Sequence, residues 1–97
     1  MELRHLRTFL IVAETQNISE AARRLRVTQP ALGRHIRDLE HTMGTALFAR
    51  ERGRLRLTPA GRTLRDRGPA ALAAIEQALR RARGVAATAA PPAGRRL

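Results

Sequence analysis

The chain has 97 residues, enough for one small domain with an extension, and this length excludes most enzyme scaffolds that enclose a deep substrate cleft. Its 19 basic residues are all arginine and outnumber eight acidic ones, so the net charge of +11 favours a polyanionic partner, nucleic acid or an anionic membrane surface. The lack of cysteine excludes disulfides and thiolate metal sites, and two phenylalanines as the only aromatic residues argue against a single-strand binder that stacks bases.

The first part of the chain predicts two helices. Residues 3–15 carry apolar side chains at steps of three and four, as an amphipathic helix does. The polar run 15–17 ends this helix. Ser19 is a favoured N-cap residue and Ile18 is positioned to act as a hydrophobic staple, so a second, short helix is expected through residue 25.

The third predicted helix, about 29–43, has the clearest periodicity. Thr28 is placed as its N-cap, and Pro30 lies in the first turn, where a missing N–H does no harm. Gly44 suits a left-handed C-terminal cap. One buried stripe is expected to contain Leu32, Ile36, Leu39 and Met43.

A hairpin rich in arginine is expected next. Leu55 and Leu57 alternate with an arginine, which predicts a strand paired across a Gly53 turn with residues 47–50. If a neighbouring helix contacts a DNA duplex, arginines at the hairpin tip can reach the minor groove of that duplex or its phosphates. The residues in question are Arg50, Arg52 and Arg54. A plain exposed turn, charged for solubility, is the alternative.

The last predicted element is a long helix over 59–84, begun by Thr58 as N-cap and ended by Gly84. About 25 residues at 1.5 Å per residue extend close to 37 Å, more than the preceding head can cover. Its apolar stripe is therefore expected to pack against a second copy of the chain. The stripe consists of Leu64, Leu72, Ile75 and Leu79. The Ala- and Pro-rich residues 85–97 are expected to form a flexible tail.

These elements define a mainly α fold. Residues 1–58 form a winged helix-turn-helix of three helices and a two-stranded wing. Residues 59–84 form a linker and dimerisation helix. A head of this size buries only about 60% of its unfolded surface, so dimerisation would supply the missing core.

The face of the third helix opposite its buried stripe indicates a ligand surface. At about 100° per residue, Pro30, Arg34 and Arg37 fall on that face, with Gly33 on its shoulder and Gln29 at the helix start. A B-form major groove admits such a helix, and arginine can bind guanine through O6 and N7. The alternative is a solvated basic face without a partner.

The residue patterns typical of metal binding, catalysis and membrane contact do not occur in this sequence. His5, His35 and His41 do not share one helix face at metal-ligand spacing, so no metal site is expected. No nucleophile–base constellation or phosphate-binding glycine loop occurs, so neither an enzyme nor a cofactor is expected. No apolar run of about 18 residues and no secretory start are present, which predicts a cytoplasmic protein without membrane contact.

Several interlocking motifs resemble the N-terminal DNA-binding domain of LysR-type transcriptional regulators over roughly residues 1–83. They are Leu3-Arg4-His5-Leu6-Arg7-x-Phe9, Ala21-Ala22-x-x-Leu25-x-Val27-Thr28-Gln29-Pro30-Ala31-Leu32, Ile36-x-x-Leu39-Glu40, Gly44, Leu47-Phe48-x-Arg50 and Leu57-Thr58-x-Ala60-Gly61.

The resemblance implies a sequence-specific regulator of transcription that binds pseudo-palindromic double-stranded promoter DNA as a homodimer, or as a tetramer in a full-length protein. It implies that the second and third helices, about 18–37, are the helix-turn-helix, and that the long helix pairs antiparallel with its mate. By position, Gln29, Pro30 and Arg34 match usual base or groove contacts, and Thr28 and Arg50 match usual backbone contacts.

Three features depart from the family pattern. Gly33 stands where serine is common, so one hydroxyl contact to DNA is expected to be missing. Gly68-Pro69 lies inside the long helix, where proline typically costs about 3 kcal/mol, so a kink or break is expected near 66–69. The C-terminal effector domain of the family is expected to be absent, and with it any small-molecule effector site.

Two other functions are compatible with the same sequence. The chain could be a dimerisation module that titrates full-length relatives, as Gly33 and the missing sensor domain suggest. It could also be a nonspecific nucleoid binder, as the charge of +11 suggests.

Overall fold

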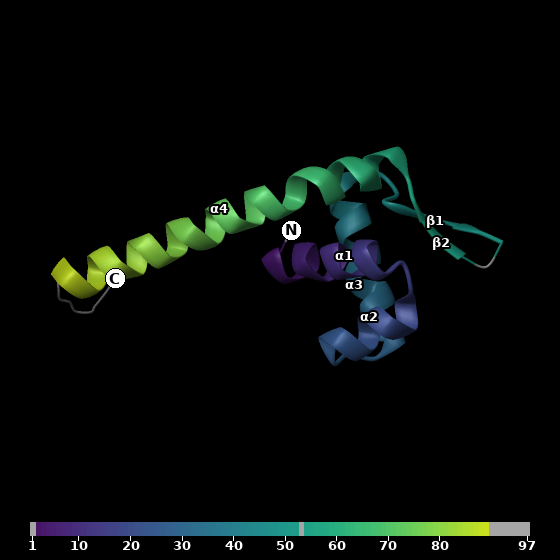
Figure 1. The fold of residues 1–97 in the computed structure, drawn as a ribbon, viewed down its shortest axis with the longest axis horizontal. Helices are drawn as coiled ribbons and strands as arrows, with labels where there is room; N and C mark the ends of the chain where they lie inside the picture. Colours follow the sequence, from purple (N-terminus) through teal and green to yellow (C-terminus); the bar gives the residue numbers. More distant parts are fainter. Residues whose placement is uncertain (1, 53, 90–97) are drawn as a thin grey trace.

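The computed structural model describes residues 2–52 and 54–89. Its elements follow the chain as α1 (Leu3–Thr15), α2 (Ile18–Leu25), α3 (Gln29–Met43), β1 (Phe48–Glu51), β2 (Arg54–Leu57) and α4 (Pro59–Ala89). Helices α1, α2 and α3 pack into a head, the two strands form a protruding wing, and α4 extends far beyond both (Figure 1). This arrangement confirms the predicted winged helix-turn-helix with a long fourth helix.

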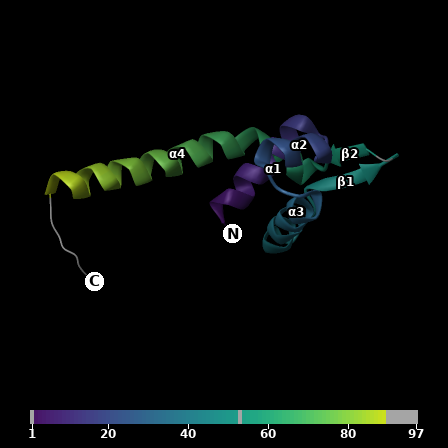
Figure 2. The same ribbon diagram turned by 90° about the horizontal axis from the view of Figure 1, so that it is seen from below.

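The wing and the far end of α4 lie at opposite ends of the long axis in both views (Figures 1 and 2). The molecule measures 57 × 26 × 22 Å along its principal axes. The head is built around one hydrophobic core. Its largest fully buried side chains are Phe9, Leu32, Leu39, Leu47 and Val12. Since these come from α1, α3 and the segment before β1, the core holds α3 against α1 and the base of the wing.

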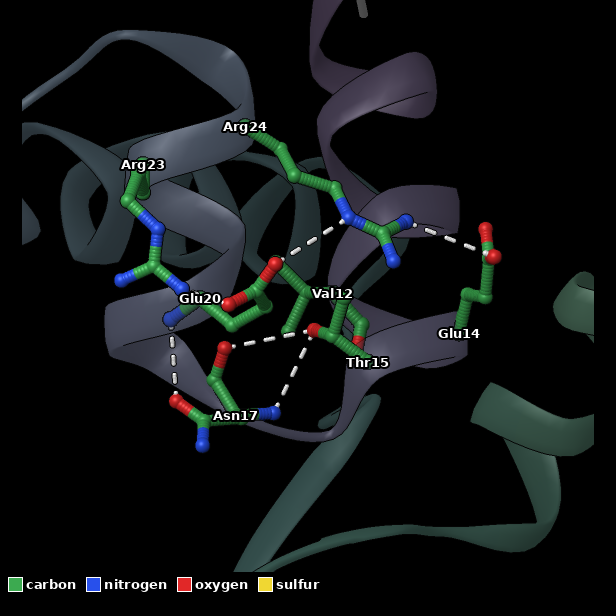
Figure 3. Close-up of polar contacts among 7 residues, drawn as sticks. All are labelled: Val12, Glu14, Thr15, Asn17, Glu20, Arg23 and Arg24. Carbon is green, nitrogen blue, oxygen red and sulfur yellow. Dashed lines mark hydrogen bonds and ion pairs between the residues drawn. The ribbon is translucent and has the colours of Figure 1, made fainter.

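The turn between α1 and α2 corrects the predicted cap of α2. Asn17, in an extended conformation, accepts a hydrogen bond of 2.9 Å from the Glu20 backbone N–H (Figure 3). Asparagine caps a helix as well as serine does, so α2 begins at Ile18 and the expectation of Ser19 as N-cap is wrong. Ile18 is therefore the first residue of the helix and not a staple before it. Arg24 adds ion pairs to Glu14 of α1 and Glu20 of α2 (Figure 3).

The caps predicted for α3 are confirmed. The Thr28 hydroxyl accepts a hydrogen bond of 3.2 Å from the Ala31 N–H, and Gly44 has a left-handed φ of 71°. Leu32, Ile36 and Leu39 are buried, but Met43 is 38% exposed, so its placement in the stripe is wrong. Met43 is the last residue of α3, and beyond Leu39 the core is completed instead by residues 47 and 48.

The wing is an antiparallel pair in which Phe48 lies opposite Leu57 and Glu51 lies opposite Arg54. Its base is attached to α3 by one carboxylate. Glu40 accepts hydrogen bonds from the backbone N–H groups of Leu47 and Phe48, at 2.7 and 3.2 Å. Helix α3 and the wing are therefore connected directly as well as through the core.

Helix α4 continues without interruption from Pro59 to Ala89, with Pro69 inside it. The break expected near 66–69 and the end expected at Gly84 are both wrong. Packing against α1 stabilises the helix around the proline, since Gly68 is buried against Leu10 and Leu6. Of the predicted tail 85–97, residues 85–89 belong to α4, and residues 90–97 lie outside the described part of the chain.

Further contacts fix the position of α4 on the head, one near the middle of the helix and others at its start. The Arg7 guanidinium of α1 donates hydrogen bonds from Nε and Nη2 to one carboxylate oxygen of Glu76. Near the helix start, the Thr58 hydroxyl caps the Gly61 N–H at 3.0 Å, as predicted. Gly61 is buried, and a Cβ there would overlap the Leu47 carbonyl oxygen. The direction in which α4 leaves the head is therefore set by specific contacts.

Candidate nucleic-acid interface

The outward face of α3 has the orientation that the helix periodicity predicts. Gln29, Pro30, Arg34 and Arg37 are exposed, while Leu32 on the opposite side has no exposed surface. For Pro30, Arg34 and Arg37, exposure follows from the spacing of the buried stripe. A side chain two residues from a buried position points about 200° away from it. The outward face of α3 is free of the core, as binding to a groove requires.

The wing brings its arginines close to the start of this helix. An open hollow is lined by residues 15–19 of the α1–α2 turn, by Gln29, and by Arg50 and residues 54–56 of the wing. Arg52 lies outside the hollow and lines a second surface depression with Arg54, Glu51 and Arg56. The structure thus joins Gln29, Arg50 and Arg54 around one concave surface and leaves Arg52 near the wing tip.

The guanidinium groups of this surface have no acidic partner in the described ranges. There the side chains of these arginines form no hydrogen bond or ion pair: Arg34, Arg37, Arg50, Arg52 and Arg54. By contrast, Arg56 pairs with Glu51 at 2.9 Å on the face of the hairpin that both share. The positive charge of α3 and the wing is therefore available to an external anion such as phosphate.

One contact at the helix start does not follow from any sequence pattern. The Gln29 side-chain amide donates a hydrogen bond of 3.1 Å to the Ser19 hydroxyl. Ser19 thereby restrains the Gln29 amide at the exposed end of α3. The contact depends on how α2 packs against α3, and spacing along the chain does not reveal it. The same is true of the α1–α2 turn as one wall of the hollow.

Behind the outward face, His35 lies against α1. Its ring stacks on that of His5 with centroids 4.9 Å apart, and its Nδ1 atom is buried without a hydrogen-bond partner in the described structure. Partial burial lowers the pKa of His35 from its ordinary value of 6.5, and the charges of His5, Arg4 and Arg34 lower it further, against the opposing effect of Asp38.

Residues 2–52 and 54–89 contain neither a metal-ligand cluster nor a membrane-spanning helix. No group of three or more His, Asp or Glu side chains there is arranged to hold a metal ion. None of the helices in these ranges combines the length and the apolar character needed to cross a bilayer.

The predicted dimerisation stripe of α4 has two parts. Leu64 and Leu72 are half-buried and pack against the core of their own head. Ile75 and Leu79 are 41% and 46% exposed and lie one turn apart, on either side of the Glu76 contact with α1. These two side chains form the exposed section of the stripe.

Three helices, a wing and a basic surface without acidic partners over α3 and the hairpin together define a winged helix-turn-helix DNA-binding domain. Residues 3–62 match the family described as bacterial regulatory helix-turn-helix protein, lysR family, and the chain belongs to this family.

Curated relatives are regulators of transcription by name. The chain is 47% identical over 79 residues to the Hca operon transcriptional activator HcaR of Escherichia coli strain K12, covering 80% of this chain and 25% of that protein. It is 56% identical over 62 residues to the HTH-type transcriptional regulator CatR of Pseudomonas putida, covering 64% and 21%. The chain thus spans about a quarter of the length of these relatives.

Solved structures give the same result at the level of the fold. The DNA-binding domain of CbnR in complex with DNA superposes with a TM-score of 0.79 at 34% identity, covering 88% of this chain and 98% of that one. The DNA-binding domain of BenM with the benA site 1 DNA gives a TM-score of 0.78 at 35% identity, covering 89% and 100%.

Proposed function

We propose that this chain binds double-stranded promoter DNA sequence-specifically as a homodimer and regulates transcription in the bacterial cytoplasm. The observation that carries the proposal is the row of exposed residues Gln29, Pro30 and Arg34 on α3, backed by a buried stripe and flanked by wing arginines without acidic partners. The DNA complexes among the structural neighbours support it.

In this proposal α3 enters the major groove with its N-terminal turns leading. Gln29 offers adenine a donor and an acceptor, and Arg34 offers guanine two N–H groups. Pro30, with its short side chain, allows close approach to the bases. Thr28, at the helix start, and Arg37 complete the surface on α3, where Thr28 is expected to contact the DNA backbone.

The wing contributes contacts that do not depend on sequence. Arg50 and Arg54 line the hollow beside Gln29, where a phosphate backbone leaving the major groove would pass. Arg52 near the tip extends this surface towards the adjacent minor groove. Such contacts raise affinity for any duplex and make it dependent on salt.

Dimerisation through α4 supplies the second head. Leu64 and Leu72 fix α4 to its own head, and the exposed Ile75 and Leu79 favour an antiparallel mate on the remaining length. A twofold pair of heads binds two half-sites, separated by one helical turn of DNA or a multiple of it, in pseudo-palindromic order.

Enrichment of random duplexes by the purified chain tests the proposal. The expected result is convergence on one motif of two inverted half-sites, at a salt concentration where a scrambled duplex binds weakly. A pool that stays random while the protein binds every duplex equally would contradict sequence-specific recognition and favour nonspecific binding. A stable dimer that binds no duplex would instead indicate a dimerisation module.

A further inference from the structure

One row of α3 has a gap that a neighbouring arginine occupies. Gln29, Gly33 and Arg37 are spaced four residues apart and lie along the same side of the helix. Gly33 leaves this row without a side chain at its middle position. The row is adjacent to Arg34, so whatever lies at the gap contributes to the same groove-facing surface.

The Arg37 guanidinium lies over the bare backbone of Gly33. A Cβ built on Gly33 would be 3.2 Å from Nη1 and 4.0 Å from Cζ of Arg37. Few real Cβ atoms have so close a neighbour, so a side chain at position 33 would displace the guanidinium by a few tenths of an ångström. The arginine can take this position because helical side chains lean towards the N-terminus of their helix.

This placement moves the charge of Arg37 towards the end of α3 that contacts bases. Recognition helices contact base edges mainly with their N-terminal residues. Arg37 is in the third turn, but its guanidinium is level with Gly33, about one turn, or 5.4 Å, nearer the start. Within the described ranges this guanidinium has no hydrogen bond or ion pair, and the adjacent Asp38 does not bind it.

We infer that Arg37, positioned by the absence of a side chain at Gly33, recognises a guanine in each half-site through O6 and N7. The inference rests on the proposed binding of DNA by α3 and extends it to a specificity-determining pair. Arg37 would make the base contact, and Gly33 is the positioning residue. The serine hydroxyl contact that is expected to be missing at position 33 would be replaced by the bidentate contact of Arg37 with guanine.

The test uses the enriched duplex and its single-base-pair variants with the complete 97-residue chain. Dissociation constants are measured at one salt concentration for the wild type, Arg37→Ala, Gly33→Ala and the double variant. Arg80→Ala is the matched control, because it removes an exposed arginine of α4 away from the head. Circular dichroism verifies that each variant keeps its helix content.

The wild type is expected to lose affinity about five- to one hundredfold when one particular guanine is replaced. Arg37→Ala removes this penalty and leaves discrimination at other positions intact. Gly33→Ala reduces the same penalty, and the double variant behaves as Arg37→Ala does. Arg80→Ala keeps the full penalty.

Three results would overturn the inference. Arg37→Ala could weaken all duplexes equally and lower the salt dependence, which identifies a phosphate contact. It could leave binding unchanged. Gly33→Ala could retain the full guanine penalty, which removes the positioning role. In all three cases the wild-type chain still enriches one motif from random duplexes. Failure of the proposed function would instead leave the enriched duplexes without a common motif.

Discussion

His35 is the residue whose surroundings alter a titration most clearly. Burial against α1, reinforced by His5 and two arginines, lowers its pKa, so the folded state disfavours the charged imidazolium. In the unfolded chain the pKa returns to about 6.5. Between these values the unfolded chain binds more protons than the folded one, and the free energy of unfolding must increase with pH.

Acidification is therefore expected to destabilise the wild type from pH 6.5 downward until the lowered pKa of His35 is passed. Urea unfolding at pH 7.5 and pH 5.5 measures this loss. His35→Gln, which cannot be protonated, should lose less stability over the same interval. Equal losses in the two proteins would show that His35 does not carry this pH dependence.

Gly61 and Gly84 form a pair of glycines in one helix with opposite surroundings. A Cβ on Gly61 meets the Leu47 carbonyl and Leu57, whereas a Cβ on Gly84 meets nothing within 4 Å. Gly61→Ala should lower the free energy of unfolding by about 1–3 kcal/mol through overpacking. Gly84→Ala should raise it by about 1 kcal/mol at most, from helix propensity. Denaturant midpoints compare the two, and a stable Gly61→Ala protein would contradict the close approach.

At the scale of elements, the wing is proposed to raise affinity for any duplex without contributing to sequence specificity. Arg52 and Arg54 are exposed on a hairpin joined to α3 by the Glu40 carboxylate, so they follow α3 onto a duplex. Arg52→Ala and Arg54→Ala should each weaken binding to specific and scrambled duplexes alike. Each should reduce the slope of log affinity against log salt by about 0.9. Unchanged slopes, equal to that of Arg80→Ala, would exclude phosphate contacts by the wing.

The elements also differ in how far the sequence predicts them. The buried stripe of α3, its caps and the alternation in β2 depend on local spacing, and all but Met43 were predictable. The choice of Asn17 over Ser19 as cap was not, because both residues suit that role and only the backbone conformation decides. Continuity of α4 through Pro69 depends on the packing of Gly68 against α1, which is a tertiary effect.

The candidate site also has features that helix spacing predicts and features that depend on the tertiary structure. The outward direction of Pro30 and Arg34 is a consequence of helix periodicity, and Gln29 is exposed because it begins α3. The hollow between the α1–α2 turn and the wing is not, because it joins segments more than 30 residues apart in the chain. The contact of Arg37 with Gly33 also needed coordinates, since the direction of a long side chain is not encoded in its spacing.

At the scale of the whole molecule, the proposed homodimer is expected to depend on the exposed part of α4. Leu79→Asp places a charge on the apolar face and should convert a dimer of twice 10.7 kDa into a monomer, as measured by light scattering. Gln77→Asp is the control, because residue 77 points about 200° away from residues 75 and 79. Loss of the dimer in both variants, or in neither, would contradict an interface on this face.

The central claim is that the outward face of α3 recognises DNA sequence, and Arg34→Ala tests it most directly. Binding isotherms at one fixed salt concentration compare this variant with the wild type on the enriched duplex and on a scrambled duplex of the same composition. We predict a loss of about 1–3 kcal/mol on the enriched duplex, relaxed discrimination at one base pair, and a much smaller change on the scrambled one. Coincident isotherms for variant and wild type on the enriched duplex would contradict the account.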